Sequence, residues 1–199
     1  MTIGLSGLTR MLLKPLPLAA YAIPDATLRS HGRLALAYGV SLAWTIPVAV
    51  YIGHHPRASR VLTPVIEVSA SIPATALLPL ILGFAIAVTP SLGAESELAA
   101  FLIALFAMQW YLLFNVIAGV RAIPGDLEEA SRAFGLRGLA YWRRLILPAI
   151  VPSVLTGSIT AWGAGWNALI VSEYIRFRGD VYTVPGIGAM MDIATFDVP

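Results

Sequence analysis

The sequence predicts an all-α protein whose helices cross a membrane. Hydrophobic residues make up 58% of the 199 residues and charged residues only 12%, whereas soluble domains carry about 25% charged residues. Uncharged runs of about 20 residues, the length that crosses the hydrocarbon layer of a bilayer, recur along the chain. The charged residues gather between these runs, and the net charge is +2. Because basic residues in membrane proteins mark cytoplasmic loops, we expect no nucleic-acid binding.

The first 33 residues are the least regular part of the chain. Their apolar stretches are each too short to cross a bilayer, and joining them would place Lys14, Pro15 and Pro17 near its centre. We therefore expect residues 1–33 to be interfacial or a poor first span, without a cleavable signal.

Four spans follow, and we expect them over residues 34–53, 65–88, 98–120 and 148–171. The second span contains Pro73 and Pro79, which leave backbone carbonyls without their helical partners. We expect other helices to supply donors, so this helix should be buried in the bundle. The short basic loop 54–60 holds two histidines, but no further ligands are nearby in the sequence, and we expect no metal site.

The charges of the loops indicate which side of the membrane each faces. The acidic loop 89–97 suits the outside and the basic loop 54–60 the inside. This arrangement places Arg29 and Arg33 outside, against the usual tendency. Glu173 follows the last span, and we expect it to be an interfacial charge that reaches water.

Small and polar residues within the spans predict contacts between helices. A stripe of small side chains at four-residue spacing lets another helix approach closely; it consists of Ser153, Gly157, Ala161 and Gly165. Polar side chains in a span seldom face lipid, so we expect Gln109, Asn115 and Asn167 inside the bundle. Together with Ser71 they are the candidates for a substrate pathway, although each would equally serve as a bond between helices.

Residues 124–148 form the most charged and most patterned stretch, which we interpret as two short helices joined by a turn. Asp126 and Glu129 have the spacing of a capping box. Gly135 suits a helix end that needs positive φ. The apolar face of this first helix would consist of Leu127, Ala130 and Phe134.

The second helix of this hairpin has an apolar stripe and a polar stripe and should end at Pro148. The apolar stripe is Leu139, Trp142 and Ile146, and the polar one is Arg137, Tyr141 and Arg144. So many charges cannot lie in hydrocarbon, so the hairpin belongs at an aqueous face.

The hairpin resembles the cytoplasmic loop of membrane permeases of ATP-binding-cassette importers. Glu129-Ala130-Ser131, then Gly135, then nine residues and Leu145-Ile146-Leu147-Pro148 repeat the family pattern Glu-Ala-Ala, three residues, Gly, nine residues, Ile, one residue, Leu-Pro. Ser131 and Leu145 depart from it while keeping size or apolarity. Residues 71–79 are similar to the nitrate, sulfonate and taurine branch, and residues 182–188 to its duplicated anion-permease type.

The resemblance implies a type I importer permease fold and a loop that docks into a groove on an ATPase subunit. The residues it assigns to that coupling are Glu128, Glu129, Ala130, Ser131, Phe134 and Gly135. Glu129 then has two readings, as a helix cap and as a carboxylate presented to the ATPase.

The resemblance also implies the partners and the location. They are ABC ATPase subunits that bind the ATP, a second permease unit, an extracytoplasmic binding protein, and the lipid of the inner membrane. The substrate would be a small anion such as nitrate, a sulfonate or taurine. This chain lacks the phosphate-binding glycine loop and should hold no cofactor. The family expects a further span after residue 199, so we expect a fragment or part of a duplicated permease.

Two other classes of function stay open. An intramembrane enzyme or lipid-handling protein would need a paired acid and base or a metal set, and no such pair stands at usable spacing, so we expect no catalytic residue. A membrane scaffold would use the hairpin as a plain partner-binding module.

Overall fold

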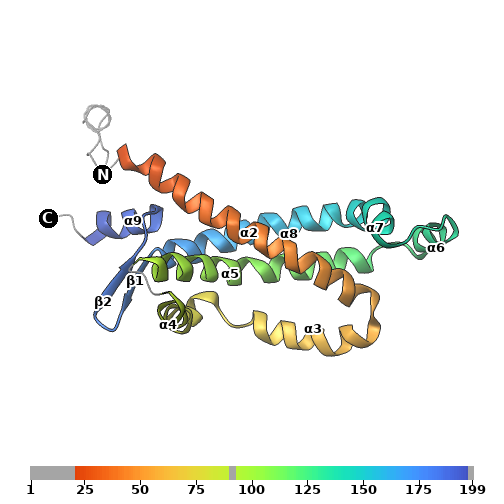
Figure 1. Ribbon diagram of the computed structural model, residues 1–199, viewed down its shortest axis with the longest axis horizontal. Coiled ribbons are helices and arrows are strands. Elements are labelled where there is room, and N and C mark those ends of the chain that lie inside the picture. The colour runs from red at the N-terminus through yellow and green to blue at the C-terminus, as the bar shows by residue number, and fades with distance from the viewer. Residues whose placement is uncertain (1–20, 90–92, 197–199) are drawn as a thin grey trace, which may run out of the picture.

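A computed structural model of the protein describes residues 21–89 and 93–196, apart from the side chains of 193, 194 and 196. Three long helices run along its long axis, α2 (Ile23–His54), α5 (Ala94–Arg121) and α8 (Leu147–Ser172) (Figure 1). Helix α5 packs extensively along both α2 and α8. The prediction of an all-α fold is confirmed, with one small β-hairpin as the exception among the described residues.

The long helices satisfy the length and hydropathy that a membrane span requires. Within the described residues, α2, α5 and the continuous helix Gly138–Ser172 each meet this requirement. Helix α2 extends the predicted span 34–53 back to Ile23, so the expectation of a separate interfacial segment is wrong for residues 23–33. Pro24 occupies the first turn of α2, where its missing N–H costs no helical bond. The part of that expectation that concerns residues 1–20 lies outside the described residues.

The predicted single span over 65–88 is instead two helices. Helices α3 (Pro56–Ala70) and α4 (Leu78–Val88) meet at a bend of 77°, with a 3₁₀ turn over Ala74–Leu77 between them. Pro73 has the extended backbone that ends a helix. The expected burial is also wrong, because α3 buries no residue and α4 buries only Leu82 and Ala85.

The expected loop 54–60 is almost absent. Only His55 separates α2 from α3, and Pro56 begins α3 in the first-turn position that proline favours. The basic residues of this stretch therefore lie on a helix at the corner between α2 and α3.

The small-residue stripe of α8 lies against α2 and α5, which confirms the predicted close approach. A Cβ atom added to Gly157 would lie 3.0 Å from Asn115 Cβ and 3.2 Å from the Tyr111 carbonyl oxygen. One added to Gly165 would lie 2.5 Å from Leu34 Cδ1. Larger side chains at these positions would push the helices apart.

A β-hairpin and a short helix follow α8. Strands β1 (Tyr174–Phe177) and β2 (Asp180–Thr183) pair in antiparallel fashion, with Phe177 opposite Asp180, and α9 (Ile187–Phe196) follows. The turn residues Arg178 and Gly179 have φ of 54° and 95°. Positive φ at both positions is what a type I′ turn requires. Sequence reasoning missed the hairpin because Arg-Gly is a weaker signal for this turn than Asn-Gly.

Glu173 is fully buried, so the expectation of an interfacial charge is wrong. Its carboxylate accepts hydrogen bonds from Ser30 Oγ at 2.5 Å, Arg33 Nη1 at 2.8 Å and the Gly188 N–H at 2.7 Å. Arg33 also donates to Glu97, with Nε 2.6 Å from Oε2. We call these four side chains, Ser30, Arg33, Glu97 and Glu173, the acid–arginine cluster.

Arg29 and Arg33 lie at the end expected to be outside, and both are ion-paired there. Arg29 pairs with Asp25 at 2.8 Å, and Arg33 belongs to the acid–arginine cluster. The positive-inside tendency is a bias rather than a strict rule, so two arginines at this end do not overturn it.

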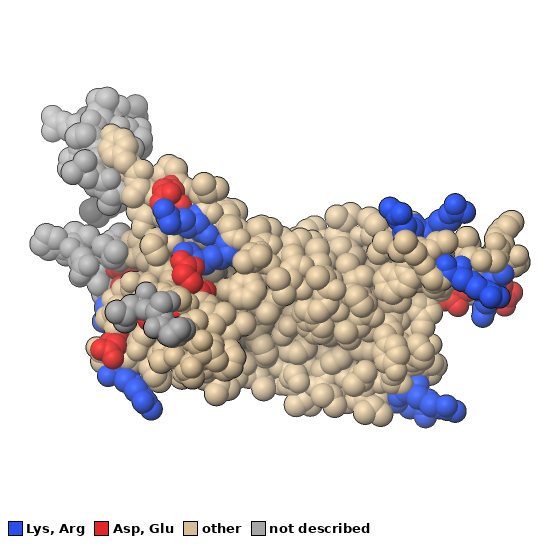
Figure 2. Space-filling model, viewed as in Figure 1, with Lys and Arg blue, Asp and Glu red and all other residues tan. Residues whose placement is uncertain are grey.

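The charged side chains visible in Figure 2 gather at the two ends of the molecule and leave an uncharged belt between them. The end that carries the 124–148 hairpin is rich in arginine, which places that end on the cytoplasmic side.

Candidate functional site

Helix α6 (Gly125–Ala133) is the first helix of the hairpin and projects beyond the ends of the long helices (Figure 1). Its N-cap is Pro124, with no side-chain capping bond, so the predicted capping box is wrong. The extended conformation of Pro124 starts the helix at once, which places Asp126 inside the first turn. A carboxylate there still stabilises the helix through the dipole.

Gly135 ends α6 with a φ of 69°, as predicted. The N–H of Leu136 donates to the Ser131 carbonyl at 2.9 Å, and that of Gly135 to the Arg132 carbonyl at 3.0 Å. These two bonds form a Schellman motif, which satisfies carbonyls left free by the helix end.

The structure divides the predicted coupling residues into two groups. Ser131 and Glu128 turn toward the protein: Ser131 is buried and its Oγ donates to the Glu128 carbonyl at 2.8 Å. The outward group is exposed and consists of Glu129, Ala130, Phe134 and Gly135. Phe134 is 83% exposed and Leu127 47% exposed. Exposed apolar side chains on one helix at an aqueous face suit contact with a protein partner.

The second helix of the hairpin does not end at Pro148, contrary to the prediction. Helix α7 (Gly138–Tyr141) continues through a π turn over Trp142–Ile146 into α8. The N–H of Leu147 bonds the Trp142 carbonyl, five residues back. This wide turn lets the helix pass Pro148 without a break, so the second helix of the hairpin is continuous with a membrane span.

Sequence reasoning missed a contact between the hairpin and the inner end of α2. His54 Nε2 lies 3.3 Å from Glu128 Oε1 and 3.2 Å from the Tyr141 hydroxyl. These residues border a cavity of about 350 Å³. No local pattern signals this contact, because 87 residues separate His54 from Tyr141.

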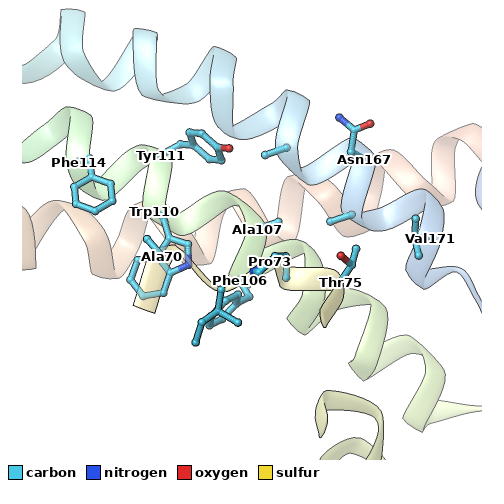
Figure 3. A pocket seen from close by; sticks show the side chains of 14 residues that line it. Ala70, Pro73, Thr75, Phe106, Ala107, Trp110, Tyr111, Phe114, Asn167 and Val171 are labelled. Carbon is cyan, nitrogen blue, oxygen red and sulfur yellow. The ribbon is translucent and has the colours of Figure 1, made fainter. Parts of the chain in front are cut away.

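A hollow of about 600 Å³ lies where the break between α3 and α4 meets α5 and α8 (Figure 3). Its polar lining includes Thr75, Tyr111, Trp110 and Asn167, and its lining residues carry no formal charge.

Of the four predicted pathway residues, Asn167 lines this hollow, whereas Ser71, Gln109 and Asn115 do not. Ser71, Asn115 and Asn167 each bond a carbonyl of their own helix region, at 2.7, 2.8 and 2.9 Å. Asn167 is exposed on this chain rather than enclosed by it.

A polar stripe that sequence reasoning did not identify runs along the exposed face of α8. It consists of Thr156, Thr160, Gly163 and Asn167, at spacings of three and four residues. Polar groups at membrane depth seldom face lipid, so this face suits a protein partner or a polar pathway. The three-and-four spacing was the available signal.

In the described part of the chain, no group of three or more His, Cys, Asp or Glu side chains could hold a metal ion.

Comparison with known proteins places this architecture in a family. Residues 45–195 match the family model of the binding-protein-dependent transport system inner membrane component. The taurine transport system permease protein TauC of Escherichia coli K12 is 30% identical over 84% of this chain and 60% of its own length. The nitrate import permease protein NrtB of Leptolyngbya laminosa is 29% identical over 72% of this chain and 48% of its own length.

A third relative is the bicarbonate transport system permease protein CmpB of Synechococcus elongatus, 26% identical over 75% of this chain and 51% of its own length. The chain thus spans about half to three fifths of the length of these relatives. The family model covers most of the chain, from the second half of α2 to the end of α9. The chain is therefore a multi-pass membrane protein that belongs to the family of binding-protein-dependent transport system inner membrane components.

Proposed function

We propose that the chain is the permease subunit of an ATP-driven importer and forms half of the translocation pathway for a small anion. The observation that carries this proposal is the exposed apolar face of α6, held at the basic end of the bundle. The turn 134–137 joins α6 to α7, which is continuous with the span α8.

An ATPase subunit is the partner that fits the α6 surface. Phe134 and Leu127 offer apolar contact, and Glu129 adds a carboxylate beside them. Movement of this surface would reach α8 through the turn 134–137 and the helix Gly138–Ser172, which no loop interrupts. ATP would be bound by the ATPase subunit. The ATPase must contact the two states of the permease differently, because only then can ATP shift the equilibrium between those states.

A second permease unit would close the pathway. The polar stripe of α8 and the neighbouring hollow are open in the single chain, and a facing copy or duplicated half would enclose them between two subunits. Substrate would be delivered at the opposite end by a separate binding protein.

The anion class rests on the relatives, which are named for taurine, nitrate and bicarbonate. The hollow offers hydroxyl and amide groups and no formal charge, which suits weak binding of an anion that must also leave. Selection among anions would then depend mainly on the binding protein.

Copurification of the full-length permease with an ATPase subunit tests the proposal. We expect Phe134→Ala to weaken the complex by about 2 kcal/mol, roughly 30-fold, because a central aromatic contact is lost. Glu129→Lys should also weaken it, whereas Asp180→Lys, an equal charge reversal on an exposed residue at the opposite end, should not. A wild-type permease that brings no ATPase with it would contradict the proposed function.

A further inference from the structure

His54 is the last residue of α2 and lies against the coupling hairpin. Its Nδ1 is 2.8 Å from the Val50 carbonyl oxygen. Its Nε2 faces two groups from different parts of the hairpin, the Glu128 carboxylate of α6 at 3.3 Å and the Tyr141 hydroxyl of α7 at 3.2 Å. The side chain therefore connects the inner end of one span with both helices of the hairpin.

The hydrogen bonds determine which nitrogen of the neutral ring carries the proton. A carbonyl oxygen only accepts, so Nδ1 must donate to Val50. Nε2 of the neutral ring then has only a lone pair to offer. It accepts from the Tyr141 hydroxyl and cannot bond the Glu128 carboxylate, which has no proton to donate.

Protonation reverses this preference. With a proton on both nitrogens, Nε2 donates, and a carboxylate is a stronger acceptor than a phenol hydroxyl. The proton would thus exchange the partner of His54 from Tyr141 to Glu128. The contact would become an ion pair between α2 and α6.

Two other charged side chains, Arg132 and Arg137, line the same cavity as His54. His55 points elsewhere: its Nδ1 bonds the Tyr51 carbonyl at 2.8 Å and its ring stacks on Tyr51.

We propose that His54 is a positioning residue whose protonation fastens the coupling helix α6 to the corner between α2 and α3, making the efficiency of coupling depend on cytoplasmic pH. The effect on coupling rests on the proposed function, whereas the fastening itself does not.

Helix α3 connects the corner at His54 with the hollow. Helix α3 begins at Pro56, two residues after His54, and runs to the break beside the hollow at Ala70 and Pro73. Arg121, at the inner end of α5, donates to Ser59 of α3. Fastening α6 to this corner would therefore link its movement to α3 and α5 as well as to α8.

A spin label on α6 tests the fastening in the purified permease alone. The chain contains no cysteine, so Ala133→Cys, at an exposed position, gives a single site in this chain. In lipid nanodiscs we expect the ratio of mobile to immobile label to fall by about two- to fivefold between about pH 8 and pH 5, as a partly exposed ion pair allows.

Three variants on this background make the test specific. His54→Gln and Glu128→Gln should abolish the pH response, and His55→Gln should keep it. A pH response that survives in His54→Gln, or a wild-type label whose mobility does not change with pH, would overturn the inference.

A second measurement separates this inference from the proposed function. In proteoliposomes with the ATPase subunit and binding protein, uptake per ATP hydrolysed by His54→Gln should be about two- to fivefold below wild type near pH 6 and equal to it near pH 8. Equal ratios at both pH values would refute the coupling role. Failure of the ATPase to bind would refute the proposed function and leave the spin-label result to stand alone.

Discussion

Removal of the Glu173 carboxylate should destabilise the protein more than removal of the Glu97 carboxylate, although both pair with Arg33. The side chain is fully buried, and its carboxylate accepts from three groups that belong to α2 and α9. Glu97, the other acidic partner of Arg33, is 50% exposed. The two acids thus contact the same arginine but differ in burial. Substituting each in turn compares a buried with a half-exposed ion pair.

The expected magnitudes follow from burial. Removing one partner of a buried ion pair costs about 3–5 kcal/mol. Arg33 keeps Glu97 as a partner in Glu173→Ala, so we expect the lower end, about 3 kcal/mol. Glu97→Ala removes a half-exposed pair and should cost about 0.2–1 kcal/mol. Glu173→Gln keeps the shape and loses the charge, so its cost should lie between these values.

Thermal unfolding of the purified protein measures these differences, and hydrogen exchange locates them. Because the Gly188 N–H bonds the carboxylate directly, Glu173→Ala should increase exchange in α9. Exchange there should change little in Glu97→Ala. Equal destabilisation by the two alanine variants would refute the reasoning, since it depends on the difference in burial.

Two glycine substitutions test the packing and the turn. Gly157→Ala should cost about 1–3 kcal/mol in thermal unfolding, because the new methyl group would crowd Asn115 and backbone atoms of α5, whereas Gly39→Ala, with nothing within 4 Å, should have little effect; equal effects would contradict the packing. Gly135→Ala should lower stability by about 1–2 kcal/mol because its φ is positive, and Gly125→Ala, with open space and no positive φ, serves as its control. An unchanged unfolding temperature for Gly135→Ala would show that the end of α6 tolerates a side chain.

Prolines show where local patterns stop being sufficient. Pro73 and Pro148 both interrupt predicted helical segments, yet the first lies at a 77° bend and the second inside a continuous helix. At Pro148 the preceding π turn buries Leu145 and Ile146, which offsets the irregular hydrogen bonding. No residue of α3 is buried beside Pro73, so packing does not oppose the break there. The outcome depends on neighbours that the local sequence does not reveal.

The sequence by itself determined the membrane-helix fold, the hairpin at an aqueous face whose first helix ends at Gly135, the close approach of α8 to neighbouring helices, and the family resemblance. These depend on composition, run length and spacing within a few turns, which the chain encodes locally. Only the tertiary structure decided that Glu173 is buried, that the polar stripe of α8 stays open, and that His54 contacts Glu128 and Tyr141. Those contacts join residues as many as 143 positions apart, and only the packing of the helices brings such residues together.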